Sequence, residues 1–159
     1  MEIKDIIQSI THSADPLVAD PANDNEISVC NKNLTQQGLP QLPSGFIDLL
    51  KVTNGFAWNG IELYGTQRVD SNDGSSYFLN DVISMAEYFA DWNRDWNDEI
   101  RLFFGRSDED LFSYNAQTNM YEILDLTGFD IMEEFDLFDD FFASILTGRL
   151  IFDLDENKE

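Results

Sequence analysis

The sequence predicts a single α+β domain whose central, mostly antiparallel sheet is flanked by N-terminal helices and closed by a C-terminal helix. Three observations support this fold class. Apolar residues recur at helical spacing near both ends of the chain. Short apolar runs separated by turn residues fill the middle, as expected for strands joined through tight turns. The length of 159 residues is typical of one domain, and 13 Phe, 5 Tyr and 3 Trp can supply its core.

The N-terminal part of the chain is predicted to hold three helices. Ile residues at 3–4 spacing predict the first, and Pro16 and Pro21 make the following segment a connector. The second helix begins near Asp24 and is closed by Gly38. The third starts at Pro43, where the missing N–H costs nothing. The predicted helices span residues 2–11, 24–38 and 43–53, and the connector spans 12–23.

Two Asn-Gly pairs organise the middle of the chain. Asn54-Gly55 is predicted to end the third helix, because Asn and Gly best tolerate the left-handed conformation of a C-terminal cap. Asn59-Gly60 separates two apolar or aromatic runs, which is the strongest short-range signal of a β-hairpin. The predicted elements here and downstream are hairpin arms over 56–58 and 61–64, a loop over 68–76, a helix over 81–96, a strand over 101–105, hairpin arms over 111–114 and 120–124, and a helix over 135–147.

Large apolar residues on the inward faces of these elements are expected to lie around one core. Helical and strand periodicities place them on the same sides as their apolar neighbours. In the closing helix, Asp136, Asp139 and Asp140 fall on the opposite side and should face water. The residues expected to be buried are Phe46, Leu50, Trp58, Leu63, Phe103, Phe138 and Phe142.

The formal net charge is −22, with 31 Asp and Glu against 9 Lys and Arg. Residues 80–159 contribute −16 of this total. A field of this sign repels nucleic acid and anionic lipid, and it attracts cationic partners. We therefore expect a protein partner with a basic surface, and binding to neither nucleic acid nor membranes. Plain solubility explains the charge equally well at this stage, and the oligomeric state is left open.

Cysteine usage and hydropathy predict a cytoplasmic protein. Cys30 is the only cysteine, so no intrachain disulfide can form. The N-terminal residues lack an apolar stretch of signal-peptide length. No apolar run approaches the ~20 residues of a membrane span.

The side chains that could carry chemistry favour surface or structural roles. His12, the only histidine, lies where a helix should end, and Cys30 falls on an apolar helix face. The polar run 70–74 fails the spacing of a calcium-binding loop in either register. Among 31 acids some pair can always be drawn as a glycosidase site, so the sequence gives little evidence for one. We predict no catalytic residue, no metal ligand and no cofactor. Two acidic pairs, Glu133-Glu134 and Asp139-Asp140, are expected on solvated helix faces.

The stretch LPQLPSGFIDLLKVTNGFAWNGIELYG, residues 39–65, resembles the signature of the SUKH superfamily, which includes the yeast cell-wall glucan-synthesis regulator. The shared pattern is Leu-Pro before a helix, an aromatic residue, a Leu pair, Asn-Gly, and a hairpin that ends in Leu-Tyr-Gly. The Trp58-Asn59-Gly60 insertion is most similar to the bacterial YrhA-like branch. Later segments similar to the family are 103–105, 110–114 and 135–146. The resemblance covers about residues 24–148, preceded by the helix and connector over 1–23 and followed by an acidic tail over 149–159.

The resemblance implies one α+β domain without a catalytic centre. Bacterial members are largely immunity proteins that bind and neutralise toxins, often nucleases, and the residues of the shared pattern are chiefly structural. An acidic protein can cover the Lys/Arg surface of a basic nuclease through fast, steered association. Toxin neutralisation is therefore the expected function, with the toxin unnamed. The alternatives are a regulatory or scaffold module that binds an endogenous partner, and a carbohydrate-active enzyme that uses two carboxylates.

Acidic residues of the second half form the predicted partner-binding surface. Three aspartates share one side of the 81–96 helix if it persists through its exit, and a neighbouring Trp could provide an apolar anchor. The helix exit and the turn over 108–110 flank the same strand, so they are expected to converge on one end of the sheet. The predicted residues are Asp91, Trp92, Asp95, Asp98, Glu99, Asp108, Glu109 and Asp110.

Salt should raise the stability of this protein. Self-repulsion at a net charge of −22 weakens when the Debye length falls from ~10 Å at 0.1 M to ~3 Å at 1 M ionic strength. Thermal melts in increasing NaCl measure this, and the midpoint should increase. A flat or falling midpoint would show that the acids are already compensated.

Overall fold

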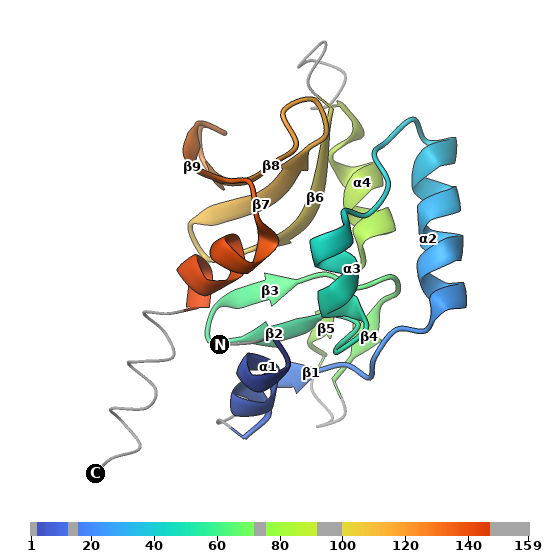
Figure 1. Ribbon diagram of the computed structural model, residues 1–159, viewed down its shortest axis with the longest axis vertical. Coiled ribbons are helices and arrows are strands. Elements are labelled where there is room, and N and C mark those ends of the chain that lie inside the picture. The colour runs from blue at the N-terminus through green and yellow to red at the C-terminus, as the bar shows by residue number, and fades with distance from the viewer. Residues whose placement is uncertain (1–2, 13–15, 72–75, 92–99, 147–159) are drawn as a thin grey trace.

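The structure is a computed structural model that describes residues 3–12, 16–71, 76–91 and 100–146. The described residues form a seven-stranded sheet of order β1-β2-β3-β6-β7-β8-β9 in which all neighbours are antiparallel (Figure 1). A separate two-stranded ribbon pairs β4 with β5. The strands are β1 Leu17–Val18, β2 Phe56–Trp58, β3 Ile61–Leu63, β4 Val69–Asp70, β5 Phe78–Leu79, β6 Arg101–Arg106, β7 Asp110–Asn115, β8 Met120–Asp125 and β9 Ile131–Phe135.

Helices from both ends of the chain cover one face of the sheet. In Figure 1, α1, α3 and the C-terminal helix over residues 138–146 lie in front of the strands. The predicted α+β class, with N-terminal helices and a closing helix, is confirmed. Among the described residues, the helices include no candidate membrane span. Besides the C-terminal helix, the helices are α1 Ile3–Thr11, α2 Asp24–Gln36, α3 Ser44–Leu50 and α4 Val82–Tyr88.

Capping and turn residues mark where α2 begins and where the β2–β3 hairpin turns. At the start of α2, the Asn23 side chain accepts a hydrogen bond from Glu26 N at 2.8 Å, and the Glu26 carboxylate accepts from Asn23 N at 3.1 Å. The hairpin turn has φ of 50° at Asn59 and 83° at Gly60, and a type I′ turn requires positive φ at both positions. Trp58 pairs with Ile61 across this turn. The predicted hairpin is therefore confirmed.

The turn over residues 53–55 is polar yet buried, and it connects four segments of the chain. Thr53 Oγ1 donates to Ala19 O at 2.8 Å, and Asn54 N donates to Asp20 O at 2.9 Å. The Asn54 side chain accepts from the Thr66 N–H at 2.8 Å and donates to the Thr66 hydroxyl at 2.8 Å. Gly55 adopts φ of 99° against the backbone of residue 65, where a Cβ would meet a backbone nitrogen at 2.8 Å. The predicted helix 43–53 is shorter in the structure, since its last residues form this turn.

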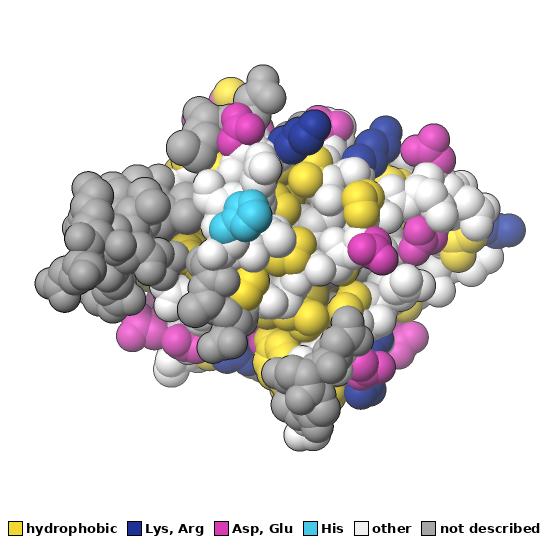
Figure 2. All heavy atoms as spheres, turned by 90° about the horizontal axis from the view of Figure 1, so that it is seen from below, with side chains coloured by type: hydrophobic (Ala, Val, Ile, Leu, Met, Phe, Trp, Pro, Cys, Tyr) yellow, Lys and Arg dark blue, Asp and Glu magenta, His cyan; other side chains and the backbone are white. Residues whose placement is uncertain are grey.

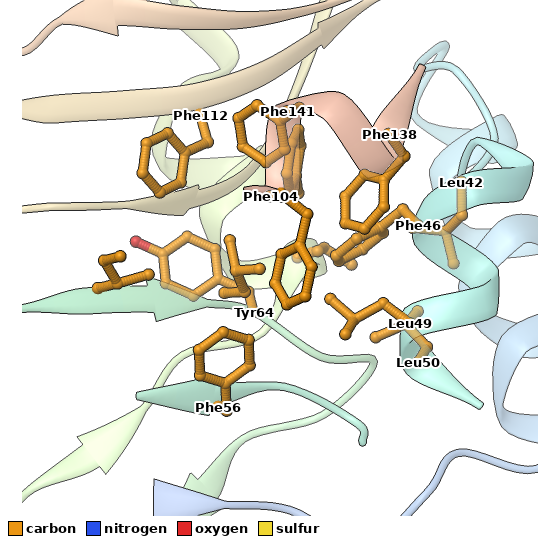
Figure 3. Close-up of a cluster of buried hydrophobic side chains, with 14 of the residues drawn as sticks. Leu42, Phe46, Leu49, Leu50, Phe56, Tyr64, Phe104, Phe112, Phe138 and Phe141 are labelled. Carbon is orange, nitrogen blue, oxygen red and sulfur yellow. The ribbon is translucent and has the colours of Figure 1, made fainter. Parts of the chain in front are cut away.

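An aromatic cluster fills the space between the sheet and the helices in front of it (Figure 3). Phe104 lies at its centre and is fully buried. Its ring centroid is 5.0 Å from that of Phe46 on α3 and 5.3 Å from that of Phe141 on the C-terminal helix. Phe104 is the extra residue of a β-bulge, because Phe103 pairs with Ser113 and Gly105 with Phe112.

All seven residues expected to be buried are buried, but they do not share one core. Phe103 points to the opposite face of β6 and stacks on Phe89, with ring centroids 4.2 Å apart. Leu111 and Leu124 complete this second, smaller cluster. The expectation of a single core is therefore wrong for Phe103, because successive side chains of a strand point to opposite faces and its neighbours Leu102 and Phe104 face the main core. The residues with confirmed burial are Phe46, Leu50, Trp58, Leu63, Phe103, Phe138 and Phe142.

Three segments differ from their sequence-based assignments. The connector over 12–23 contains the edge strand β1, which pairs Leu17 with Ala57. The loop over 68–76 contributes β4, which pairs with β5. In the third and largest difference, the predicted helix over 135–147 begins only at residue 138, and Phe135 is the last residue of strand β9. Glu133-Glu134 therefore lie on a strand and not on a helix face. Both glutamates are exposed, as expected, and Asp136, Asp139 and Asp140 also face water.

Truncating Phe104 to Ala should lower the free energy of unfolding by about 3–5 kcal/mol, because a cavity would open among four aromatic rings. Val29 on α2, which is 59% exposed, provides the control. Val29→Ala should change the free energy of unfolding by less than about 0.5 kcal/mol. Urea denaturation of both variants gives the comparison. Equal effects would contradict the central position of Phe104.

Candidate functional site

One end of the sheet gathers acidic side chains from separate turns, and we call it the acidic end. Its residues are Asp108 and Glu109 between β6 and β7, Asp110 at the start of β7, Asp125 at the end of β8, and Asp130 just before β9. Register brings these segments together, since Asp110 pairs directly with Asp125. The β2–β3 turn lies at the same end, where a Cβ on Gly60 would lie 3.0 Å from Asp108 Oδ2.

Hydrogen bonds hold the acidic end in a defined conformation. Ser107 Oγ accepts from the N–H of Asp110 at 3.1 Å and donates to the Asp110 carboxylate at 3.1 Å. Ser107 N donates to Asp110 O at 2.9 Å. Leu126 N donates to Glu109 O at 3.0 Å, which connects this turn to the β8–β9 connection. These bonds fix the backbone under the carboxylates without neutralising them.

The carboxylates of the acidic end have few cations near them. Chain positions 107–148 contain neither Lys nor Arg. Arg106, the last residue of β6, directs its Nε to Ser107 O at 3.3 Å. Within the described part of the chain, none of the five carboxylates forms an ion pair of 4.0 Å or less. The acidic end therefore presents uncompensated negative charge to solvent.

A groove of about 800 Å³ runs beside the acidic end, along β1 and the β2–β3 hairpin. Glu62, Arg106 and Asp108 line it with both signs of charge. The Tyr77 hydroxyl donates to Glu62 Oε1 at 2.7 Å, and burial together with this bond raises the pKa of Tyr77 above its ordinary value. Figure 2, viewed from the side of α1 and β1, shows a central apolar band with acidic side chains mostly towards its rim. The groove is open to solvent and carries charges of both signs.

The structure brings together only part of the predicted partner-binding surface. Asp108, Glu109 and Asp110 share the acidic end, whereas Asp91 is exposed just beyond α4. The described strand β6 has its two termini at opposite ends of the sheet, since Arg101 pairs with Asn115 and Arg106 with Leu111. Flanking a common strand therefore does not make its two ends converge. The remaining predicted residues, Trp92, Asp95, Asp98 and Glu99, lie outside the described residues.

Sequence reasoning missed Asp125 and Asp130 as members of the acidic end. Each lies beside an apolar strand, and nothing local marks them as neighbours of the 107–110 turn. The absence of Lys and Arg from positions 107–148 is the one sequence signal that includes them. Their grouping depends on strand pairing, which joins positions fifteen or more residues apart in the chain.

One buried charged cluster could be mistaken for a catalytic site. Arg101 Nε donates to Glu122 Oε1 at 2.7 Å, Arg101 Nη2 to Glu122 Oε2 at 3.2 Å, and Ser113 Oγ to Glu122 Oε1 at 2.9 Å. Both side chains of the pair are at most 5% exposed. Glu122 is the one fully buried carboxylate of the described residues, so they contain no buried carboxylate pair of the kind a glycosidase needs. These hydrogen bonds connect β6, β7 and β8, so the cluster stabilises the middle of the sheet.

The other candidate reactive groups also occupy structural or surface positions. His12 is exposed, and Cys30 is buried on the inward face of α2. Burial, with a smaller contribution from Asp81, raises the pKa of the Cys30 thiol to about 12, so it is protonated at physiological pH. Within the described ranges, no group of three or more His, Cys, Asp or Glu side chains could hold a metal ion. Most of the 70–74 run lies outside them.

No protein-family model matches the chain, and no curated protein matches it.

Replacing Arg101 by Met should cost about 3–5 kcal/mol of unfolding free energy, because Glu122 would remain buried without its cation. Lys51 is the control, because its 3.9 Å pair with Asp24 is exposed and its loss should cost less than about 1 kcal/mol. Adding Glu122→Leu to the Arg101 variant should recover part of the loss in urea denaturation. If the second substitution recovers none of the lost unfolding free energy, the unpaired Glu122 carboxylate is not the cause of the loss.

Proposed function

We propose that this protein is a cytoplasmic, non-enzymatic binding protein that neutralises a basic toxin domain by direct contact. The acidic end is the observation that carries the proposal. It presents Asp108, Glu109 and Asp130 in exposed positions on a backbone fixed by hydrogen bonds. Such a surface favours a partner rich in Lys and Arg, and it disfavours nucleic acid and anionic lipid.

The physical advantage of this arrangement is rapid capture. A toxin released near its target must be bound before it acts, so the association rate matters as much as the affinity. Uncompensated charge over a surface raises the rate of diffusional encounter by about 10–10³-fold, and most strongly at low salt. Fixed turns reduce the ordering cost that a flexible acidic segment would incur on binding.

A nuclease toxin fits this surface well. Its active site must present cationic groups to phosphate, and an acidic protein that covers those groups competes with the substrate. The resemblance of residues 39–65 to a superfamily rich in immunity proteins supports the same function. The proposal assigns no chemical step to any residue of this chain.

Capture of the partner followed by a protection assay tests the proposal. The tagged full-length chain serves as bait in extracts of the producing organism, and mass spectrometry identifies bound proteins. A captured toxin domain is then expressed in a sensitive host with and without this chain. Coexpression should restore growth, and the purified complex should be inactive. Capture of an endogenous regulator without any toxin, or a toxin that stays active in the complex, would contradict it.

Charge reversal tests the role of the acidic end. The double variant Asp108→Lys and Glu109→Lys should lower the association rate constant about tenfold and reduce its salt dependence, while the dissociation rate changes little. A second double variant, Asp5→Lys and Glu87→Lys, carries the same net charge on α1 and α4, with both residues exposed. Stopped-flow or surface-plasmon measurements compare the two. Equal slowing would show that only net charge matters.

A further inference from the structure

Strand β9 forms one edge of the main sheet, opposite to β1 in the strand order (Figure 1). It pairs with β8 on one side, and no described strand pairs with its other side. Its exposed apolar side chains are unusual for a solvated edge, because Met132 is 62% exposed and Ile131 44%. Leu137, 60% exposed, follows at the start of the C-terminal helix. The edge thus offers backbone hydrogen-bonding groups together with apolar surface.

A small pocket adjoins this edge on the face covered by the C-terminal helix. Its volume is about 270 Å³. The register explains its position: Ile123 pairs with Glu133 and Leu124 with Ile131, so Met132 is an extra residue that bulges from β9. The lining residues are Asp110, Phe112, Ile123, Met132, Glu133, Ser144 and Ile145.

The pocket combines an apolar wall with two carboxylates. Phe112, Ile123 and Ile145 are buried hydrophobic residues, whereas Asp110 and Glu133 bring negative charge from β7 and β9. Neither carboxylate forms an ion pair of 4.0 Å or less with another described residue. An Arg or Lys side chain matches these features, since its aliphatic stem packs on apolar surface while its head pairs with carboxylates.

Charge selects the occupant of this edge. A second copy of the chain would bring its own Glu133 and Glu134 against those of the first, and like charges placed opposite each other on paired strands are destabilising. The same acids favour an extended segment that carries positive charge. Strand addition supplies affinity through the main chain, and side-chain pockets supply specificity.

We propose that β9 binds an extended segment of a basic partner protein as an added strand, with one Arg or Lys side chain inserted between Asp110 and Glu133. This deepens the proposed function, on which the identity of the partner rests, by naming the contact. Asp110 belongs both to this pocket and to the acidic end. The surface that attracts the basic partner therefore adjoins the pocket that holds its Arg or Lys side chain.

Two peptides test the chemistry directly. The first is Thr-Thr-Val-Arg-Val-Thr-Thr with blocked termini, and the second replaces arginine by citrulline, which keeps the shape but removes the charge. In ¹⁵N-resolved NMR titrations, the arginine peptide should shift the amide signals of Asp110, Ile123 and Glu133 and protect β9 amides from exchange. The citrulline peptide should bind at least about tenfold more weakly, which is the loss expected for a charge-assisted hydrogen bond.

Two variants of one strand separate the pocket from general electrostatics. Glu133 lines the pocket, whereas Glu134 pairs with Glu122 on the opposite face of the sheet. Glu133→Gln should weaken the arginine peptide about tenfold, and Glu134→Gln, with the same change in charge, less than twofold. Both residues are exposed, so an unchanged thermal midpoint verifies the fold. Equal weakening by both variants, equal binding of both peptides, or no binding would overturn the proposal. Concentration-dependent dimerisation through β9 would overturn it too, by identifying a second copy as the occupant.

The same variants distinguish this inference from the proposed function. If the chain neutralises a toxin and Glu133→Gln leaves its affinity for that toxin unchanged, the pocket assignment is wrong and the function stands. If the arginine peptide binds as expected and no toxin is neutralised, the pocket stands and the function is wrong.

Discussion

The buried turn at residues 53–55 is the constraint on which the rest of the fold depends. Thr53 and Asn54 are polar groups without access to water, so each must find its partners inside the protein. Those partners are Ala19 O and Asp20 O before α2 and Thr66 after β3. Satisfying them fixes where the connector, α3 and the β2–β3 hairpin stand relative to one another. The two strands of that hairpin then provide the pairing edges for β1 and β6.

Strand β6 performs a second organising role, because its alternating side chains supply both cores. Phe103 and Phe104 face opposite sides of β6, so the phenylalanines of the C-terminal helix pack on one face while Phe89 stacks on the other. The buried pair of Arg101 with Glu122 lies on the face of Phe103, since Phe103, Ser113 and Glu122 occupy paired positions on β6, β7 and β8. The central sheet is thereby held by apolar packing on one face and by mixed packing and ion pairing on the other.

Antiparallel pairing converts a diffuse excess of acids into a localised surface. The β2–β3, β6–β7 and β8–β9 connections all lie at one end of the sheet, because successive antiparallel strands reverse direction. Two of these connections carry Asp108, Glu109 and Asp130. Repulsion among these acids opposes folding, and the hydrogen bonds around Ser107 and between β7 and β8 hold them in place.

The α+β class, the hairpin at Asn59-Gly60 and the burial of the large apolar residues could all be predicted from the amino-acid sequence. These follow from capping, turn chemistry and periodicity, which act over a few residues. The strand at 131–135 could not be predicted locally, because the segment IMEEF lacks alternation and takes its extended form from pairing with β8. The grouping of Asp108, Glu109 and Asp110 with Asp125 and Asp130 was decided in the same way. Strand order and register depend on contacts between distant parts of the chain, and no local pattern encodes them.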